Sequence, residues 1–522
     1  MVNSSIFISP KIDNIGEPLG DKISDMYKTF LNYLADKKGL QINLEERAFV
    51  YKDNNKKIKM HVRFWFYSSL KRFFLYISPA KSSLEESLYS IGDLQSTFMK
   101  FINISFSDGV NIGNIHFDRL SLEEQKDISD WKVLLFNRNN FTYSEISLLD
   151  FMNNKKDKIK EIFDTNSNRG NNIYLLSPEI KQEESPLYDP FIRILNNLIR
   201  KNITSNVVKI DYDLQTVENL LSGSNMKDSF IVLVLPEGSE EKYNNLKCWL
   251  IENRINSQCI QINTLRNKAF KDITLSIKNN LLLEMSSKLG EELIMLDPSV
   301  SKVNNIIYLT DIDEPNNLFS VSIDKIEKNK IVERVKILKN IKFEIDEFQD
   351  AVKLDEGSLD TLIKIIKSTD LVKDSADIYV TKRWDKKQIE KFTDKLKENN
   401  ISVRNIFYIS TRAIKGVVDN SAEKYKFYYK KIDNRAVIIK TVNTLKWYGD
   451  LFPIWCEKIY PNEDITSDDI DTILWSIKKR IYRIDNFDSL KIPEIFSLLK
   501  SQKKKYLSLI RNNLDLDIAT LL

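Results

Sequence analysis

Short apolar runs alternate with helical patterns through the middle of the chain. The first run is Ile173 to Leu176, and a stronger one, Phe230 to Leu235, contains only aliphatic and aromatic side chains. Helical spacing follows in Phe191 to Ile199 and Tyr243 to Glu252, and another strand is expected at Cys259 to Ile262. Apolar strands separated by helices are typical of a parallel sheet that is buried on both faces. Such a sheet places ligand sites at the ends of its strands.

A second region with an α/β pattern begins after residue 298. We expect strands at Asn305 to Leu309 and Leu318 to Ile323, then a helix at Leu359 to Ile366. The first 170 residues instead have strand-like segments between polar helices and turns rich in Asn and Asp, which indicates an α+β lobe. The pattern therefore predicts three domains, at residues 1–170, 171–298 and 299–522.

Composition restricts the kinds of chemistry that we expect. The chain has 78 basic and 74 acidic side chains, so a site for a polyanion must come from local clustering of charge. Three cysteines without close spacing and two distant histidines argue against a disulfide framework, a zinc site and His-based catalysis. No apolar run is long enough to span a membrane and the amino terminus lacks a signal pattern, so we expect a cytoplasmic protein.

The most informative polar residues follow the strand Phe230 to Leu235. Tyr243 and Lys247 are four residues apart on a predicted helix and share one face, Gln258 lies on the next strand, and Lys288 precedes a Leu-Gly pair. An aromatic ring can stack on a terminal base while two cations and an amide bind its phosphate. Each residue alone also fits an ordinary packing or surface position, but the ordered set favours a phosphate pocket.

This set resembles the MID domain of Argonaute proteins. In that family a strand ends in Leu-Pro, a Tyr and a Lys follow four residues apart, Ser-Gln lies on the next strand, and a helix ends in Lys-Leu-Gly. The resemblance implies that Tyr243, Lys247, Gln258 and Lys288 hold the 5′-phosphate of a guide strand. It also implies that the terminal carboxylate, here that of Leu522, reaches this pocket, where Mg²⁺ would bridge it to the phosphate.

The sequence departs from this family pattern at two positions. Glu284, one turn before Lys288, lies where relatives often carry a basic or amide side chain. Glu291 replaces a second glycine. For the whole chain, the resemblance implies a Rossmann-like MID domain followed by an RNase H-like PIWI domain, with the α+β lobe preceding both.

The segment from Asn305 to Asp311 resembles the first PIWI strand, which places Asp311 at the first catalytic aspartate. Cleavage by this fold needs carboxylates on different strands to hold two metal ions. Near the place of the second acid the chain has Arg383, with Asp385 two residues too late, and Ser497 stands at the last ligand position. We therefore predict a protein without catalytic activity, in which Asp311 is a remnant.

If this chain is aligned differently with the PIWI pattern, Asp485 or Glu494 could take the place of the missing metal-binding acid. A slicing endonuclease that depends on a guide therefore stays an alternative. An unguided α/β scaffold or nucleotide-binding protein is a second alternative.

Cations and aromatic residues interleave from Lys424 to Lys431 in a strand-like stretch. Such a composition can follow a nucleic-acid backbone, so Lys424, Lys426 and Lys430, with Arg412, are weak candidates for a nucleic-acid channel. An amphipathic strand with a solvated basic face is the preferred explanation of the same pattern, and the strand could serve both purposes.

About 170 residues precede the MID-like region, which is too few for the full N, linker and PAZ arrangement of long Argonautes. The resemblance therefore implies a PAZ-less protein that binds a short 5′-phosphorylated RNA or DNA guide and pairs it with plasmid or phage DNA. A binder that does not cut needs an effector. The candidates are a helicase-nuclease, or a TIR, SIR2 or nuclease protein that carries an APAZ region.

Overall fold

A computed structural model gives the fold of the chain. The residues that it describes are 5–11, 41–43, 48–53, 56–67, 70–79, 118–121, 124–137, 140–154, 157–158, 161–162, 172–177, 206–209, 215, 217–219, 229–235, 240–253, 255–261, 281, 283–285, 288, 293–327, 330–346, 351–369, 372, 375–410, 426–439, 454–478 and 516–517. Among them, no helix has both the length and the apolar character needed to cross a membrane. The three cysteines are free thiols.

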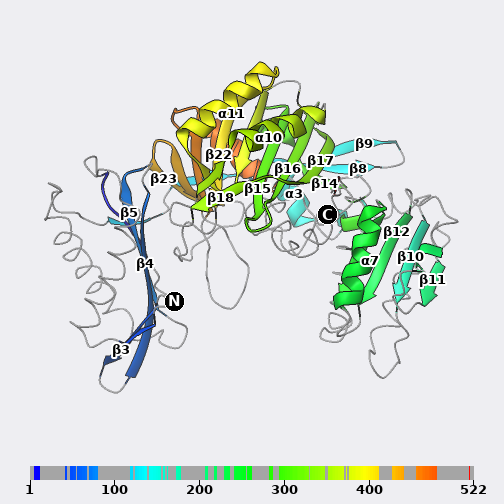
Figure 1. The fold of residues 1–522 in the computed structure, drawn as a ribbon, viewed down its shortest axis with the longest axis horizontal. Coiled ribbons are helices and arrows are strands. Elements are labelled where there is room, and N and C mark those ends of the chain that lie inside the picture. The colour runs from blue at the N-terminus through cyan, green and yellow to red at the C-terminus, as the bar shows by residue number, and fades with distance from the viewer. Residues whose placement is uncertain are drawn as a thin grey trace.

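A ten-stranded mixed sheet forms the centre of the molecule (Figure 1). Its middle strands β15 (Asn305–Asp313), β20 (Ser375–Val380) and β22 (Ser402–Ser410) run parallel to one another. The other strands pair antiparallel on the two sides. These are β16 (Leu318–Glu327), β17 (Lys330–Asn340), β26 (Leu516–Asp517), β25 (Ile454–Tyr460), β24 (Ala436–Ile439), β23 (Lys426–Asp433) and β7 (Glu124–Asp127).

Helices cover both faces of the central sheet, which explains its unbroken apolar strands. On β15, Ile307 and Leu309 pack in a core with helices α10 (Glu356–Ser368) and α11 (Lys386–Glu398). The alternate residues Ile306 and Tyr308 pack in a second core with α12 (Ser467–Lys478) and α3 (Leu148–Asn153). Because successive side chains of a strand point to opposite faces, a sheet between two helical layers needs apolar residues at every position. The predicted second α/β region is therefore confirmed.

A separate four-stranded parallel sheet has the order β11-β10-β12-β13 (Figure 1). Its strands are β10 (Asn172–Ser177), β11 (Asn206–Lys209), β12 (Ser229–Leu235) and β13 (Asn256–Gln261). Helix α7 (Glu240–Glu252) connects β12 to β13. Three of these strands, β10, β12 and β13, overlap runs that the sequence predicted, and five successive residues of β12, Phe230 to Val234, are buried. This sheet is the predicted Rossmann-like part of the chain.

The amino-terminal residues form an antiparallel sheet of the order β2-β3-β4-β5-β1-β6. Its strands are β1 (Ser5–Ile8), β2 (Gln41–Asn43), β3 (Ala48–Asp53), β4 (Lys56–Tyr67), β5 (Arg72–Pro79) and β6 (Asp118–Arg119).

Strands from residues 124–147 join sheets made by later parts of the chain. Strand β7 pairs with β23 at one edge of the central sheet. A hairpin of β8 (Lys132–Asn137) and β9 (Thr142–Ser147) pairs with β14 (Ile294–Leu296), which is followed by the short 3₁₀ helix η3 (Pro298–Val300). A small sheet of β18 (Phe343–Asp346), β19 (Ala351–Leu354) and β21 (Arg383–Trp384) completes the described elements. The domain boundaries at residues 170 and 298 stay predictions.

Candidate nucleic-acid site

The turn of the chain from β12 through α7 to β13 places Lys247 over the first half of β13. The side chain of Lys247 is 4% exposed, which is unusual for a lysine. Its Nζ donates to the backbone carbonyl oxygen of Ser257 at 3.3 Å and also to the Ser257 hydroxyl. A buried ammonium group is retained only where oxygen acceptors replace its hydration, so β13 holds this cation in a fixed place.

Lys288 approaches the same point from a helical segment that is distant in the sequence. Its Nζ donates to the carbonyl oxygen of Ser257 at 2.8 Å and to Oε1 of Gln258 at 2.5 Å. The sequence analysis placed four side chains in a phosphate pocket. Three of them therefore meet at one end of β13, namely those of Lys247, Gln258 and Lys288.

The two ammonium groups lie less than about 7 Å apart, because each is within 3.3 Å of the same carbonyl oxygen of Ser257. Two like charges at this separation repel by on the order of 2 to 3 kcal/mol at an effective dielectric constant of about 20. An anion between Lys247 and Lys288 would replace that repulsion with two charge-assisted hydrogen bonds. The arrangement is therefore suited to a phosphate group.

Two predicted members of this pocket cannot be placed in it. Tyr243 lies on α7 one turn before Lys247, but its side chain is outside the described part of the structure. Leu522, whose carboxylate was expected to share Mg²⁺ with the phosphate, is also outside it. The nearest described residues, Leu516 and Asp517, pair with β17 at the edge of the central sheet. The predicted Mg²⁺ bridge thus stays a prediction.

Asp311 lies at the carboxyl end of β15, where the ladder to β16 has an irregularity. It is 5% exposed and accepts a 2.6 Å hydrogen bond from the Thr381 hydroxyl. The parallel pairing of β15 with β20 places the residues after Val380 beside it. The strand after which the sequence analysis placed a second acid is therefore the neighbour of β15, and Thr381 with the two cations Lys382 and Arg383 follows it.

Arg383 forms a buried ion pair with Glu457 of β25. Its guanidinium carbon also lies 5.5 Å from the ring centroid of Tyr408. Glu457 was missed by the sequence analysis, although an acid inside the apolar strand Ile454–Tyr460 is a signal for a buried partner. The Glu457 carboxylate of β25 therefore neutralises the Arg383 guanidinium.

The other acids near the end of β15 accept hydrogen bonds from protein groups. Asp313 accepts from the Asn316 amide at 2.6 Å, and Glu314 accepts from the backbone N–H of Ile345 at 2.7 Å. Asp385 caps the amino terminus of α11. Within the described residues, no group of three or more His, Cys, Asp or Glu side chains could hold a metal ion. Asp485, Glu494 and Ser497 lie outside those residues.

The basic and aromatic strand β23 is an inner strand of the central sheet. Phe427 and Tyr428 are buried, Lys430 is half-buried, and Lys426 stands directly opposite Asp127 of β7. Hydrogen bonds from Ser129, and to a smaller degree the charge of Lys426, lower the pKa of Asp127.

A second acid of β7, Glu124, lies opposite Tyr429 of β23. Burial, and then the neighbouring Glu124 carboxylate, raise the pKa of Tyr429. The acidic strand β7 thus neutralises part of the predicted channel. Lys424 and Arg412, the other candidates for this channel, lie outside the described residues.

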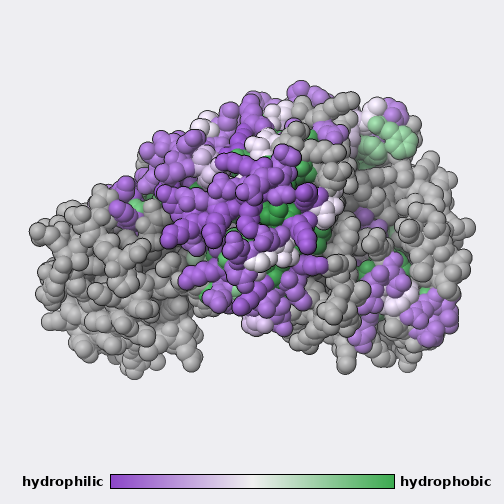
Figure 2. Space-filling view, turned by 45° about the horizontal axis from the view of Figure 1, so that its top comes forward, coloured by the Kyte–Doolittle hydropathy of each residue, from purple (hydrophilic) through white to green (hydrophobic). Residues whose placement is uncertain are grey.

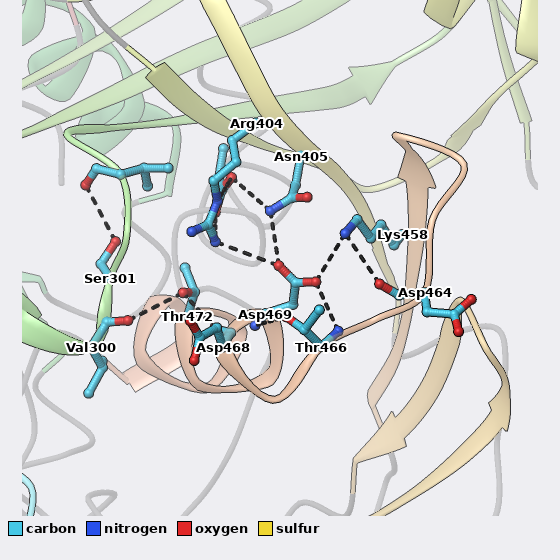
Figure 3. Close-up of polar contacts among 12 residues, drawn as sticks. Val300, Ser301, Arg404, Asn405, Lys458, Asp464, Thr466, Asp468, Asp469 and Thr472 are labelled. Carbon is cyan, nitrogen blue, oxygen red and sulfur yellow. Dashed lines mark hydrogen bonds and ion pairs between the residues drawn. The ribbon is translucent and has the colours of Figure 1, made fainter.

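A buried polar network joins β20, β22, β25 and α12 (Figure 3). Arg404 binds the Asp377 carboxylate through Nε at 3.2 Å, and the Asn405 amide bridges Asp377 and Asp469. Lys458 Nζ pairs with Asp469 at 3.1 Å. The two carboxylates of Asp377 and Asp469 are therefore matched by two cations, Arg404 and Lys458.

The environment of Asp377 disfavours its charged form. Burial raises the pKa of Asp377 to about 6, and the Arg404 guanidinium opposes part of that rise. Asp469 also accepts from the backbone N–H of Thr466 at 3.0 Å and so caps α12. The network was not predicted, because no local spacing links these residues in the sequence.

No protein-family model matches the sequence, and a search of curated proteins gives no match either. Solved structures do match. Clostridium butyricum Argonaute bound to a guide DNA and a 19-mer target DNA has a TM-score of 0.52 at 15% identity, over 90% of this chain and 66% of that one. Marinitoga piezophila Argonaute in complex with a 5′ OH guide RNA has a TM-score of 0.52 at 12% identity, over 91% and 85%. Drosophila Piwi has a TM-score of 0.57 at 10% identity, over 98% and 86%. The predicted resemblance is thereby confirmed at the level of the fold, and this chain has an Argonaute-like architecture.

Proposed function

We propose that this protein binds a short guide strand by its 5′-phosphate and uses it to hold complementary nucleic acid. The convergence of Lys247 and Lys288 on the end of β13 carries this proposal, because two cations that share one carbonyl acceptor are suited to bind an anion. The architecture supports it, since the Clostridium butyricum Argonaute structure contains a guide and a target strand. A phosphate ligand shared by two lysines gains about 1.5 to 3 kcal/mol from each charge-assisted hydrogen bond.

We further propose that the protein does not cut the strand that it holds. Cleavage by two metal ions needs several carboxylates around one point. Here Asp311 is bonded to Thr381, and the acid of β25, Glu457, neutralises Arg383. The further cation Lys382, two residues after the end of β20, would repel a metal ion at the place where the second acid is needed. The proposal implies that a separate effector acts on the target, of the helicase-nuclease kind or with an APAZ region, in defence against plasmids or phages.

Sequencing of the nucleic acid that co-purifies with the full chain tests the binding proposal. We expect short strands of uniform length that carry a 5′-phosphate, and their chemistry would show whether the guide is RNA or DNA. Loading with synthetic guides then compares 5′-phosphate and 5′-hydroxyl ends, and tighter binding of the phosphate form is expected. Equal affinity for both ends would contradict the pocket.

Incubation of the loaded protein with a labelled complementary strand and Mg²⁺ or Mn²⁺ tests the absence of cleavage. We expect the target strand to stay intact. Cleavage that is lost on Asp311→Ala substitution would instead establish the slicing alternative, which the position of Asp311 at the end of β15 keeps open.

A further inference from the structure

The β8–β9 hairpin presents an aromatic ring to solvent at its tip. Phe141 is 74% exposed, and the only other large hydrophobic side chain exposed among the described residues is Leu149, at 41%. The hairpin projects from the central body at the upper right of Figure 1, and Figure 2 shows a green surface there. A phenylalanine at this position contributes little to the core, so burial does not explain it.

The backbone at this position also disfavours phenylalanine. Phe141 has a φ of 53°, in the left-handed region that Gly and Asn occupy easily in hairpin turns and that bulky residues avoid. The turn is held from within, because Oδ1 of Asn140 accepts from the Thr142 hydroxyl at 2.7 Å and from the Thr142 backbone N–H at 3.3 Å. The fold thus keeps an exposed ring in a conformation that is unfavourable for its residue type, which points to a role outside the chain.

Phe141 belongs to a small aromatic cluster at the hairpin. The ring centroid of Phe136 lies 6.4 Å from that of Phe141 and 5.2 Å from that of Tyr143. Phe136 itself packs against one of the two cores of the central sheet. The exposed ring of Phe141 is therefore linked to the core through its edge contact with Phe136, and most of its surface stays open for stacking.

The size and chemistry of the tip fit a nucleobase better than a protein. One phenylalanine offers roughly 150 to 250 Å² of surface, while a stable protein interface needs about 800 Å² from each partner. Residues 136–144 read Phe-Asn-Arg-Asn-Asn-Phe-Thr-Tyr-Ser and contain no carboxylate that would repel a phosphate backbone. Aromatic rings with neighbouring amides are typical of sites that bind single strands.

The hairpin also lies within reach of the phosphate pocket. The backbone N–H of Phe136 donates to the carbonyl oxygen of Leu293 at 3.0 Å, and Leu293 is five residues after Lys288. Five residues span at most about 18 Å, so the Phe141 ring lies within about 35 Å of Lys288. A strand anchored at its 5′ end covers that distance in about ten nucleotides, at a rise of ~3.4 Å each.

We propose that Phe141 stacks on an unpaired base of the nucleic-acid strand that this protein binds. This inference rests on the proposed binding of nucleic acid, and it adds a second contact to the 5′-phosphate pocket. Stacking of a base on an aromatic side chain changes affinity by roughly 5- to 150-fold for a single ring.

The test uses the full chain and a short single-stranded oligonucleotide with a 5′-phosphate, in which 2-aminopurine replaces one base at a time over the first ~10 nucleotides. We expect strong quenching of its fluorescence at one position. Phe141→Ala should abolish that quenching and weaken binding roughly 5- to 150-fold, while Phe141→Tyr should keep both. Phe141→Gly should lose binding equally and keep or raise the melting temperature, because glycine adopts this φ without strain. Leu149→Ala is the matched control and should change nothing.

Unchanged binding and fluorescence in Phe141→Ala and Phe141→Gly would overturn the proposal. So would a variant that binds the oligonucleotide normally but loses self-association or a co-purifying protein, since the tip would then dock a protein. Equal binding of 5′-phosphate and 5′-hydroxyl strands would contradict the phosphate pocket alone, because stacking at Phe141 does not depend on the end group. Failure of the unaltered chain to bind any strand would overturn both.

Discussion

The polar side chains at the strand ends of the two α/β sheets are arranged in opposite ways. In the four-stranded sheet, Lys247 and Lys288 leave different elements and meet at the same carbonyl oxygen of β13. In the ten-stranded sheet, Asp311 and Glu457 lie on different strands, and each is engaged by another partner. Convergent cations can bind a phosphate, whereas separately paired acids are not arranged to share a metal pair. This difference is what the proposed function uses, since it favours phosphate binding at the first sheet and disfavours a metal pair at the second.

The largest expected effect comes from breaking the buried ion pair between Arg383 of β21 and Glu457 of β25. Arg383→Ala leaves Glu457 buried without its cation, and removal of one partner from such a pair costs about 3 to 5 kcal/mol. Urea denaturation of the variant measures this loss. The double variant Arg383→Met with Glu457→Leu should recover most of it. If Arg383→Ala instead keeps full stability and gains cleavage with Mn²⁺, the contrast between the two sheets is wrong.

The Asp377 network should make stability depend on pH. The folded-state pKa of about 6 is raised above the usual value, so the protonated form is favoured by folding. Its contribution is therefore complete below about pH 4 and is lost as the pH rises to about 6, by on the order of 2 to 3 kcal/mol.

Denaturation of the unaltered protein and of Asp377→Asn across this range measures the effect. The stability of the unaltered protein should fall relative to that of the variant between pH 4 and 6. Parallel curves would show that Asp377 titrates normally. Asp360→Asn changes an exposed acid on α10 and is the control.

At the phosphate pocket, Lys288→Ala should weaken binding of a guide with a 5′-phosphate by roughly 10- to 150-fold, since it removes a charge-assisted hydrogen bond of about 1.5 to 3 kcal/mol. A guide with a 5′-hydroxyl should bind almost unchanged. Fluorescence anisotropy with both guides measures the ratio. Lys364→Ala, an exposed lysine on α10, removes the same charge elsewhere and should leave the ratio intact. An equal loss of affinity for both guides would show that Lys288 does not bind the 5′-phosphate, and the four-stranded sheet would then lack the proposed binding site.

The smallest effect is expected at Asp385, which the sequence analysis considered as a displaced catalytic acid. Its carboxylate accepts from the backbone N–H of Gln388 at 2.8 Å, so it caps α11. Asp385→Ala should cost about 1 kcal/mol, and Asp385→Ser should restore most of that loss. Thermal denaturation measures both. A change in metal affinity in place of a change in stability would return Asp385 to the catalytic candidates.

Local patterns predicted the four-stranded parallel sheet from apolar runs such as Phe230 to Leu235, and they placed Lys247 and Gln258 beside it. The pairing of Arg383 with Glu457 could not be predicted, since it joins strands that are 74 residues apart. The same is true of the Asn405 bridge, which spans 64 residues to Asp469. Spacing within one element shows which side chains share a face, but only the sheet order shows which elements become neighbours.

The placement of β7 and β8 bears on how this chain can be divided. A fragment that begins at residue 171 would keep the MID-like and PIWI-like regions but would expose the edge of β23 from Lys426 to Tyr429, and would leave β14 without its antiparallel neighbour. Open edges of this kind recruit strands from other copies and promote aggregation. Shortened versions intended for crystallisation or for assembly with an effector should therefore begin after β6 and before Glu124, so that β7 and β8 keep their pairing with β23 and β14.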